Sequence, residues 1–469
     1  MTRVFLVDPS VRDFAGHFRT QLAGIAAMLA PEERYAVVHR HWSGGAMLGG
    51  AHVVPWFQRS LLDLQRLGPK ELATRSRDAT RRHLLSLGLS RAFADPLAYC
   101  AKWLVWNGAL LRSHARSVWQ PWRLRSGADV GHQSVYWLEL RRLVDEFRLG
   151  PRDHVVMPTT DQQLLLALLS ICASMSADKL PRFHLRFLCD DECNISGYRS
   201  PMSFEDMIRW LHAKSLLNRR VFLYAETTRL ADWLETIAGV RPALAPYPVF
   251  AGSRPPRATP RPSLRIGYLG QARSNKGFDR LAAILLRFEA LYLEATSTCC
   301  NLPDISVVVQ AAPGSQKMLR VFEEAARTLR LGLEIIDRTV DQEGYQKIVD
   351  RIDILMLPYK VSKYRQKGSG IAQEALVNAI PFVCSSDTGL VDYLIEGNGE
   401  SAQTDDEFAS ALLKIALNYD HYLSRAILAA AIHDRLHQHN PLRNNICGSD
   451  LVHSRGNIGG ITGILERRA

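Results

Sequence analysis

The chain has 469 residues, of which 47% are hydrophobic and 22% are charged, and it carries a formal net charge of +11. This composition can bury a sizeable core and excludes wholesale disorder, so the length predicts two or three domains. The eight cysteines do not form a dense disulfide framework, and no run of 18 apolar residues predicts a transmembrane helix. We therefore expect a soluble protein of a reducing compartment, which is cytoplasmic.

The first half of the chain alternates short apolar runs with helical patterns. Strands are expected at 4–7, 37–38, 154–158, 184–188 and 221–225, and helices at 18–29, over most of 55–125, at 133–148 and through 164–169. This alternation is typical of a parallel sheet covered by helices. Asp161 is expected to cap or begin the helix that follows it, and the run 226–228 to cap the next one. His154 begins a strand, where we expect a structural role.

An excess of positive charge lies between residues 75 and 125. This stretch contains ten Arg or Lys residues against Asp78 and Asp95, together with four tryptophans. Cations with interfacial tryptophans suit a surface that lies on anionic lipid, at the inner face of a membrane. The alternative is a pair of core-packed helices with solvated arginines. Nucleic acid is not expected as a partner, because no recognition module accompanies the charge.

A short segment at 189–193 combines acidic and thiol side chains in the sequence Cys-Asp-Asp-Glu-Cys. It could be an acidic metal-binding motif or half of a thiolate metal site. No second Cys/His pair at ligand spacing accompanies it, and zinc normally requires four ligands. We expect a solvated loop here and no metal site.

The second half begins after a segment rich in Pro and Arg, 251–263, which predicts an interdomain linker. Strands are expected near 264–269, 305–310, 333–336, 353–357 and 381–385, with helices between them. The predicted domains are an N-terminal Rossmann-like domain at 1–250 with a helical insertion around 55–148, a C-terminal Rossmann-like domain at 264–435, and a peripheral tail at 436–469. Ligands of such sheets bind beyond the carboxyl ends of the strands.

Two motifs in the C-terminal domain fall at such strand ends. The strand at 264–269 leads to Gly270, and two cations, Arg273 and Lys276, follow before Gly277. Either cation alone could be an ordinary solvent-exposed side chain. Together, after a strand that ends in glycine, they are suited to bind a phosphate group.

The second motif is a buried strand, a polar loop, a short helix and another buried strand. It places the N–H groups of Ser369 and Gly370 at the positive end of the helix and Glu374 about one turn inside it. Such a carboxylate can accept hydrogen bonds from ribose or sugar hydroxyls, although it could also be a plain helix-start carboxylate. The combination predicts a nucleotide-sugar site.

These motifs resemble those of the retaining glycosyltransferases of family 4, which have the GT-B fold. Ala379-Ile380-Pro381 stands where the family usually has Gly-x-Pro, and 389–399 resembles the loop that follows. The resemblance covers 264–430 well and 1–250 only in outline. It implies two doubly wound Rossmann-like domains that face each other across a cleft. It also implies a nucleotide-sugar as substrate, with no bound cofactor and no metal.

The resemblance also implies roles for single residues. It assigns Arg273 and Lys276 to the donor diphosphate and Glu374 to the ribose. Gly270, Gly277, Ser369 and Gly370 would complete the donor site. The family's first glutamate is replaced here by Gln366, which keeps hydrogen bonding but loses the charge, and the flanking Arg365 and Lys367 could supply cations instead. Gly16 and His17 resemble the family's acceptor-side loop, although His17 could equally be a surface histidine.

The function expected from this resemblance is transfer of a hexose-like sugar to a glycan, lipid-linked or small-molecule acceptor, with retention. A nucleotide-sugar epimerase is a rival that would require further carboxylates in the N-terminal domain. A non-catalytic nucleotide-sugar-binding or assembly subunit is a rival from another class, and Gln366 favours it.

Overall fold

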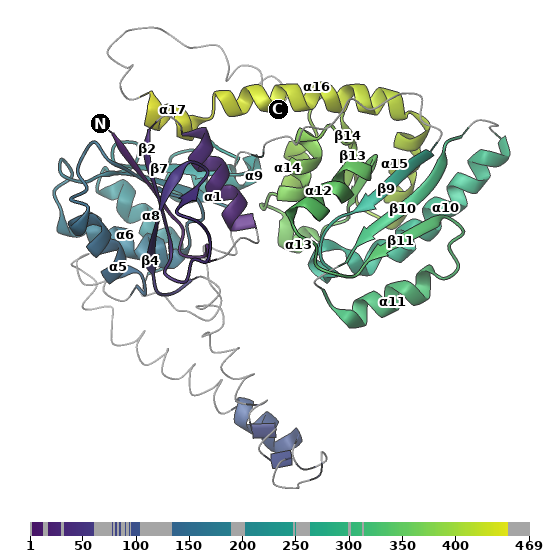
Figure 1. Ribbon diagram of the computed structural model, residues 1–469, viewed down its shortest axis with the longest axis horizontal. Coiled ribbons are helices and arrows are strands. Elements are labelled where there is room, and N and C mark those ends of the chain that lie inside the picture. The colour runs from purple at the N-terminus through teal and green to yellow at the C-terminus, as the bar shows by residue number, and fades with distance from the viewer. Residues whose placement is uncertain are drawn as a thin grey trace.

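The computed structural model describes residues 2–12, 17–29, 32–60, 134–188, 202–246, 249, 263–298, 302–311 and 314–448, together with scattered positions between 77 and 103. They form two β-sheets, each covered by helices on both faces, that lie side by side (Figure 1). The linker predicted at 251–263 lies outside the described residues except for Ser263, and the segment 189–193 lies wholly outside them.

The N-terminal domain is built on an eight-stranded sheet of order β3-β4-β2-β1-β5-β6-β7-β8. Its strands are β1 (Arg3–Val7), β2 (Glu33–His39), β3 (Met47–Leu48), β4 (Ala51–Phe57), β5 (His154–Met157), β6 (Arg182–Phe187), β7 (Val221–Ala225) and β8 (Ala243–Leu244). All neighbouring pairs are parallel except β3 with β4. The helices are α1 (His17–Met28), α5 (Trp137–Glu146), α6 (Gln162–Ser174), α8 (Phe204–Ala213) and α9 (Thr228–Ala238).

Alternation along the strands gives this sheet two buried faces. On β1, Phe5 and Val7 pack in the cluster with α5, α6, α8 and α9, whereas Val4 and Leu6 pack in the cluster with α1. Asp161 caps α6 by accepting hydrogen bonds from two backbone N–H groups, as predicted. The helical prediction that began at residue 55 is wrong for 55–57, because β4 continues to Phe57 and pairs with β2.

The C-terminal domain has a fully parallel six-stranded sheet of order β11-β10-β9-β12-β13-β14. Its strands are β9 (Ser263–Tyr268), β10 (Asp304–Gln310), β11 (Gly332–Ile336), β12 (Ile354–Leu357), β13 (Phe382–Ser385) and β14 (Gly399–Ala402). Its helices are α10 (Leu281–Thr298), α11 (Gln316–Ala326), α12 (Gln342–Arg351), α13 (Val361–Tyr364), α14 (Gly370–Val377) and α15 (Asp405–Leu417), with short 3-10 helices η2 (Ser274–Lys276), η3 (Phe278–Arg280) and η4 (Gly389–Tyr393).

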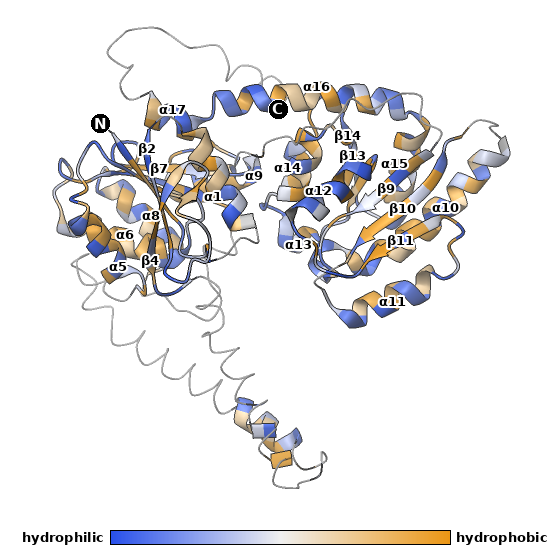
Figure 2. Cartoon of the chain, in the orientation of Figure 1, coloured by the Kyte–Doolittle hydropathy of each residue, from blue (hydrophilic) through white to orange (hydrophobic). Residues whose placement is uncertain are grey.

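The five strands predicted here are confirmed to within a residue or two at each end. The hydrophobic residues of β10 run through the middle of this domain in Figure 2. One core cluster packs α10, α11 and α15 on the sheet, and another packs α12 and α14. Cys384 is buried in β13, where burial raises the pKa of its thiol to about 12, so the thiol stays protonated and unreactive near neutral pH.

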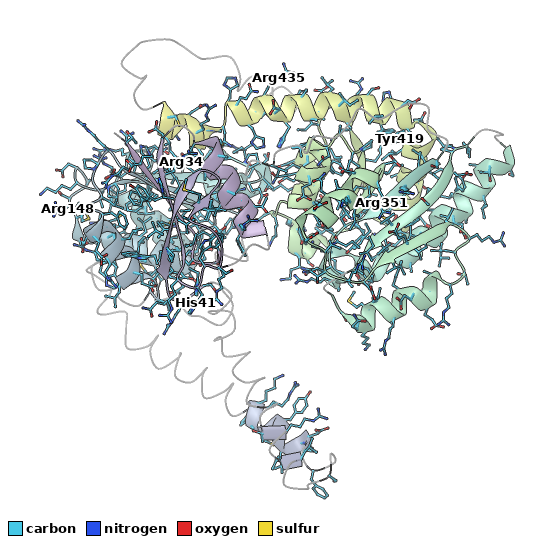
Figure 3. All side chains as sticks on the ribbon, in the orientation of Figure 1. Arg34, His41, Arg148, Arg351, Tyr419 and Arg435 are labelled. Atoms are coloured by element: carbon cyan, nitrogen blue, oxygen red, sulfur yellow. The ribbon has the colours of Figure 1, made fainter. Side chains whose placement is uncertain are left out.

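The last two described helices return the chain to the N-terminal domain. Helix α16 (Tyr419–Gln438) runs along both domains, with Tyr419 at its C-terminal-domain end and Arg435 near the other (Figure 3). Helix α17 (Pro441–Cys447) then buries Leu442 and Ile446 among residues of β1, β2 and α1. The peripheral tail expected from 436 onward is therefore wrong for 436–447, because two apolar side chains one turn apart complete the N-terminal core.

Candidate functional site

The glycine turn after β9 folds as the cation motif requires. Gly270 has a φ of +144° and Gly277 a φ of +71°, so both adopt backbone conformations that suit glycine. A Cβ on Gly277 would lie 1.8 Å from the carbonyl oxygen of Pro358. A Cβ on Gly270 would lie 3.2 Å from Nζ of Lys276, so the lysine folds back over the turn.

Lys276 is the cation that this turn holds most closely. Its Nζ lies 5.6 Å from the centre of the Tyr359 ring, at a distance that allows a cation–π contact. The pKa of Lys276 is lowered to about 8, chiefly by burial and also by the nearby Arg273, whereas Glu374 opposes the shift. Arg273 precedes η2 and its side chain is exposed. The site therefore has one constrained cation and one solvent-facing cation.

Helix α14 begins where the sequence predicts. Ser369 is its N-cap, and the Ser369 hydroxyl accepts a hydrogen bond from the N–H of Ala372 at 3.5 Å. Gly370 is the first helical residue, and Glu374 follows one turn later, half-buried. Burial raises the pKa of Glu374, whereas a hydrogen bond from Tyr345 and the charge of Lys276 oppose the rise. Tyr345 belongs to α12, and its hydroxyl donates a hydrogen bond to Oε2 of Glu374.

The structure brings the two motifs together at the carboxyl edge of the sheet. A Cβ on Gly270 would lie 3.8 Å from Cδ1 of Ile371, in the first turn of α14. Lys276 and Glu374 are close enough for each to shift the pKa of the other. A cation, a carboxylate and a helix N-terminus thus share one edge. This arrangement can hold a phosphate beside a hydroxyl-bearing group.

A cavity of about 150 Å³ lies at the same edge, over the outer strands. Its polar lining comes from Ser315, Gln316, Asp337 and Thr339, after β10 and β11. Ala272, two residues beyond Gly270, lines it as well. The cavity therefore adjoins the glycine turn.

The comparisons with known proteins bear on this arrangement. No protein-family model matches the sequence, and no curated protein matches it significantly. Solved structures match it over nearly the whole chain. Trehalose-6-phosphate synthase OtsA of E. coli, bound with UDP-2-fluoro glucose, is 15% identical, covers 97% of this chain and 100% of its own, and has a TM-score of 0.56. Sucrose-phosphate synthase of Thermosynechococcus elongatus is 10% identical, with coverages of 94% and 99% and a TM-score of 0.51.

A third match is Anabaena HepE in complex with UDP and glucose, which is 12% identical, with coverages of 97% and 100% and a TM-score of 0.50. The chain has the GT-B fold. The fold class expected from the sequence is confirmed, whereas membership of family 4 stays a prediction at these identities.

Gln366 occupies the loop that leads into α14 of the GT-B C-terminal domain. Its backbone carbonyl accepts a hydrogen bond from Oγ1 of Thr227 at 2.6 Å. Its side-chain oxygen is buried and has no hydrogen-bond partner among the described residues. A buried amide oxygen without a partner can accept a hydrogen bond from an N–H or O–H group of a bound ligand.

The residues predicted for the acceptor side of the GT-B cleft lie wholly or partly outside the described residues. Gly16 lies outside the described residues, and His17 begins α1 with its side chain outside them, so their predicted roles stay predictions. The described residues contain no cluster of three or more His, Cys, Asp or Glu side chains arranged to hold a metal ion. His154 lies buried in β5 and hydrogen-bonds His184, which in turn hydrogen-bonds Tyr224, in keeping with the structural role predicted for it.

Sequence reasoning missed the residues that join the two GT-B domains beneath this site. Thr227 caps α9, as expected of the 226–228 run, but the same run also contacts the C-terminal domain. Tyr345 was missed because nothing in its sequence neighbourhood marks it. Tyr345 and its partner lie 29 positions apart in the chain, Thr227 and its partner 139, and Glu226 and Gln373 147, so no local pattern could have identified them.

Proposed function

We propose that this protein is a glycosyltransferase that takes a sugar from a nucleotide-diphosphate donor. The observation that carries this proposal is the convergence of Lys276, Glu374 and the N-terminus of α14 at one edge of a GT-B domain. Lys276, Arg273 and the amides at Ser369 and Gly370 would bind the diphosphate. Glu374, held by Tyr345, would accept hydrogen bonds from the ribose.

The chemistry follows from the charge that develops during transfer. The bond between the anomeric carbon and the diphosphate oxygen breaks, and the diphosphate leaves with the electron pair. The acceptor hydroxyl oxygen forms the new bond to the anomeric carbon, and its proton passes to the departing diphosphate oxygen. Fixed cations and helix dipoles beside the leaving oxygen stabilise the transition state without reorganising. We propose that Lys276 and α14 supply this stabilisation without a metal, and that transfer proceeds with retention to a glycan, lipid-linked or small-molecule acceptor.

The cavity beside the glycine turn suits the base of the donor. Ser315, Asp337 and Thr339 offer donors and acceptors that a nucleobase edge can pair with, and Ala272 and Leu319 offer apolar contact. The base would then lie over β10 and β11, the diphosphate over β9, and the sugar toward Gln366.

The experiment that tests the donor site is a thermal-shift screen against UDP, GDP, ADP and their sugar conjugates, with and without a divalent metal. We expect one nucleotide to raise the midpoint of unfolding without metal, and Lys276→Ala to abolish the rise. Lys317→Ala, which removes an exposed lysine from α11, is the matched control. No shift with any nucleotide in the wild-type protein would overturn the proposal.

A non-catalytic nucleotide-sugar-binding subunit is the second candidate, and Gln366 favours it because a neutral amide replaces the carboxylate that the family resemblance implies. Both candidates bind the donor, so only turnover separates them. Release of nucleoside diphosphate from the selected donor in the presence of membrane extract or a glycan mixture supports the transferase. Tight binding with no release supports the subunit.

We propose further that the segment around 77–103 rests on an anionic membrane surface. The described residues there lie apart from both domains in Figure 1. Their large apolar side chains are exposed: Phe93 by 69%, Leu97 by 49%, Tyr99 by 62% and Trp103 by 65%. Arg77 and Lys102 each approach the Tyr99 ring to 5.8 Å. Core-packed helices, the alternative weighed from the sequence, do not account for four exposed apolar side chains, whereas cations mixed with aromatics fit lipid headgroups.

Vesicle co-sedimentation tests this surface. We expect binding to phosphatidylcholine vesicles that contain phosphatidylserine, weak binding to phosphatidylcholine alone, and loss of binding in the double variant Phe93→Glu, Trp103→Glu. Leu293→Glu, at an exposed leucine of α10, is the control. Equal binding of the wild type and the double variant would contradict the proposal. No helix among the described residues is long and apolar enough to cross a bilayer.

A further inference from the structure

Four consecutive residues at the end of β7 and the start of α9 contact the C-terminal domain. Oγ1 of Thr227 donates to the carbonyl of Gln366, and the N–H of Thr228 donates to Oδ2 of Asp392. Arg229 donates to the carbonyl and side chain of Asp387 at 3.1 and 3.3 Å. Glu226 begins this series and, like Thr227, is buried.

Glu226 is a carboxylate enclosed by groups from both domains. From the C-terminal domain, Nε2 of Gln373 donates to its Oε1 at 2.6 Å, and the Tyr393 hydroxyl donates to the same oxygen at 3.3 Å. From the N-terminal domain, Nη2 of Arg186 lies 3.9 Å from its Oε2. Arg186 is itself fixed by hydrogen bonds to the carbonyls of Ala245 and Pro158. Three side chains therefore hold Glu226 in one position.

The loop that leads into α14 lies directly against this carboxylate. A Cβ on Gly368 would lie 2.5 Å from the Tyr393 hydroxyl oxygen and 2.7 Å from Oε1 of Glu226. Gln373, the donor to Glu226, immediately precedes Glu374 in α14. The contact thus reaches both ends of the candidate donor motif: the loop through Gly368 and the helix through Gln373.

We infer that Glu226 is a positioning residue, which fixes the donor-site loop 366–369 and the first turn of α14 from the opposite domain. This inference rests on the proposed donor site. It makes donor affinity depend on contact between the two domains, so that a nucleotide bound in the C-terminal domain favours the state in which they touch. Glu226 itself does not contact the nucleotide.

The physical reason is the cost of the charge. A buried carboxylate is stabilised only when hydrogen-bond donors and a cation surround it. Gln373 and Tyr393 supply the donors only while the C-terminal domain is in contact. If the domains separate, Glu226 and Arg186 keep each other, but Gln373 loses its acceptor and the loop at Gly368 loses its support. Donor binding and domain contact are therefore linked, and linkage of this kind is reciprocal.

The test compares Glu226→Ala, Glu226→Gln and Tyr393→Phe with the wild type in the full-length chain. Affinity for the nucleotide that the thermal-shift screen selects is measured by calorimetry, and domain separation by small-angle X-ray scattering with and without that nucleotide. We expect Glu226→Ala to weaken binding about tenfold, within the range usual for coupled sites. Glu226→Gln, which keeps an acceptor for Gln373, should recover most of the affinity, and Tyr393→Phe should lose only a few-fold.

Scattering separates positioning from direct contact. The nucleotide-free Glu226→Ala protein should be more extended than the wild type, and nucleotide should make it more compact. The Lys276→Ala variant should lose nucleotide binding. Without nucleotide, it should scatter X-rays as the nucleotide-free wild type does. Asp206→Ala, which removes an exposed carboxylate from α8, is the matched control.

The outcomes keep the two proposals apart. A wild type that binds no nucleotide overturns the donor site itself. A wild type that binds, with Glu226→Ala of equal affinity and equal scattering, overturns the role of Glu226 and leaves the donor site standing. If Glu226→Ala does not fold, Tyr393→Phe decides, because affinity and scattering equal to those of the wild type in this variant would exclude a positioning role.

Discussion

The two domains contribute to the candidate site in different ways. The C-terminal domain offers Lys276, Glu374 and the N-terminus of α14 within two short segments at one sheet edge, where a ligand can reach them. The N-terminal domain offers Glu226 and Thr227, which act on the loop of the other domain and not on a ligand. Changes in the first set should alter binding with little effect on the fold, and changes in the second should alter both modestly.

Lys276→Ala should give the largest loss of binding. Removal of the constrained cation leaves the diphosphate without its closest charge, and we expect affinity for nucleoside diphosphates to fall about a hundredfold, on the scale of a lost charge-assisted contact. Calorimetry measures the affinity and thermal unfolding reports the fold. Because burial disfavours the charge of this lysine, the midpoint of unfolding should not fall. If the Lys276→Ala variant binds as tightly as the wild type, then Lys276 of the C-terminal domain does not contact the diphosphate.

Glu374→Ala should lower affinity less, by about tenfold, and selectively. The ribose loses its acceptor while the diphosphate keeps Lys276, so binding of a nucleoside diphosphate should weaken and binding of inorganic pyrophosphate should not. Tyr345→Phe, which removes the hydrogen bond that holds Glu374, should show a smaller loss in the same direction. Equal losses for both ligands would mean that Glu374 does not face the ribose.

The pH dependence of binding should follow Lys276. Its pKa is lowered to about 8, so the free protein loses this positive charge as the pH rises through 8, and affinity should fall toward tenfold per pH unit above that value. The charged groups that face it are Arg273, Lys367 and Glu374. Lys276→Arg should keep its affinity up to pH 9.5, because a guanidinium stays protonated. Calorimetry at pH 7, 8 and 9 distinguishes the two, and a flat profile for the wild type would contradict the assignment.

Thr227→Val should give the smallest change on the N-terminal side. The hydroxyl both caps α9 and donates to Gln366, so its loss should cost about 1 kcal/mol of unfolding free energy and two- to three-fold in nucleotide affinity. Urea unfolding and calorimetry measure the two effects. Thr236→Val in the same helix, where the hydroxyl bonds only within α9, is the control for stability without affinity.

The parts that could be predicted from the sequence are those fixed by local chemistry. The strands of the C-terminal domain, the cap at Asp161 and the start of α14 follow from apolar runs, glycine turns and capping side chains that lie within a few residues of one another. The sequence did not identify Glu226 as an interdomain residue, because its partners Gln373 and Tyr393 lie more than 140 residues away. Its third partner, Arg186, lies at the end of another strand, β6. The return of the chain at α17 escaped because Leu442 and Ile446 form too short an apolar pattern to indicate what they pack against.

The return of the chain at α17 has a practical consequence for dividing the molecule. A fragment that ends near residue 250 would carry the sheet of the N-terminal domain without Leu442 and Ile446, and would expose the apolar face that they fill beside Val4 and Leu6. Such a fragment should aggregate unless the peptide 438–448 is supplied. A protease cut between the domains, by contrast, should leave two pieces that stay together, because α17 remains embedded in the core of its neighbour.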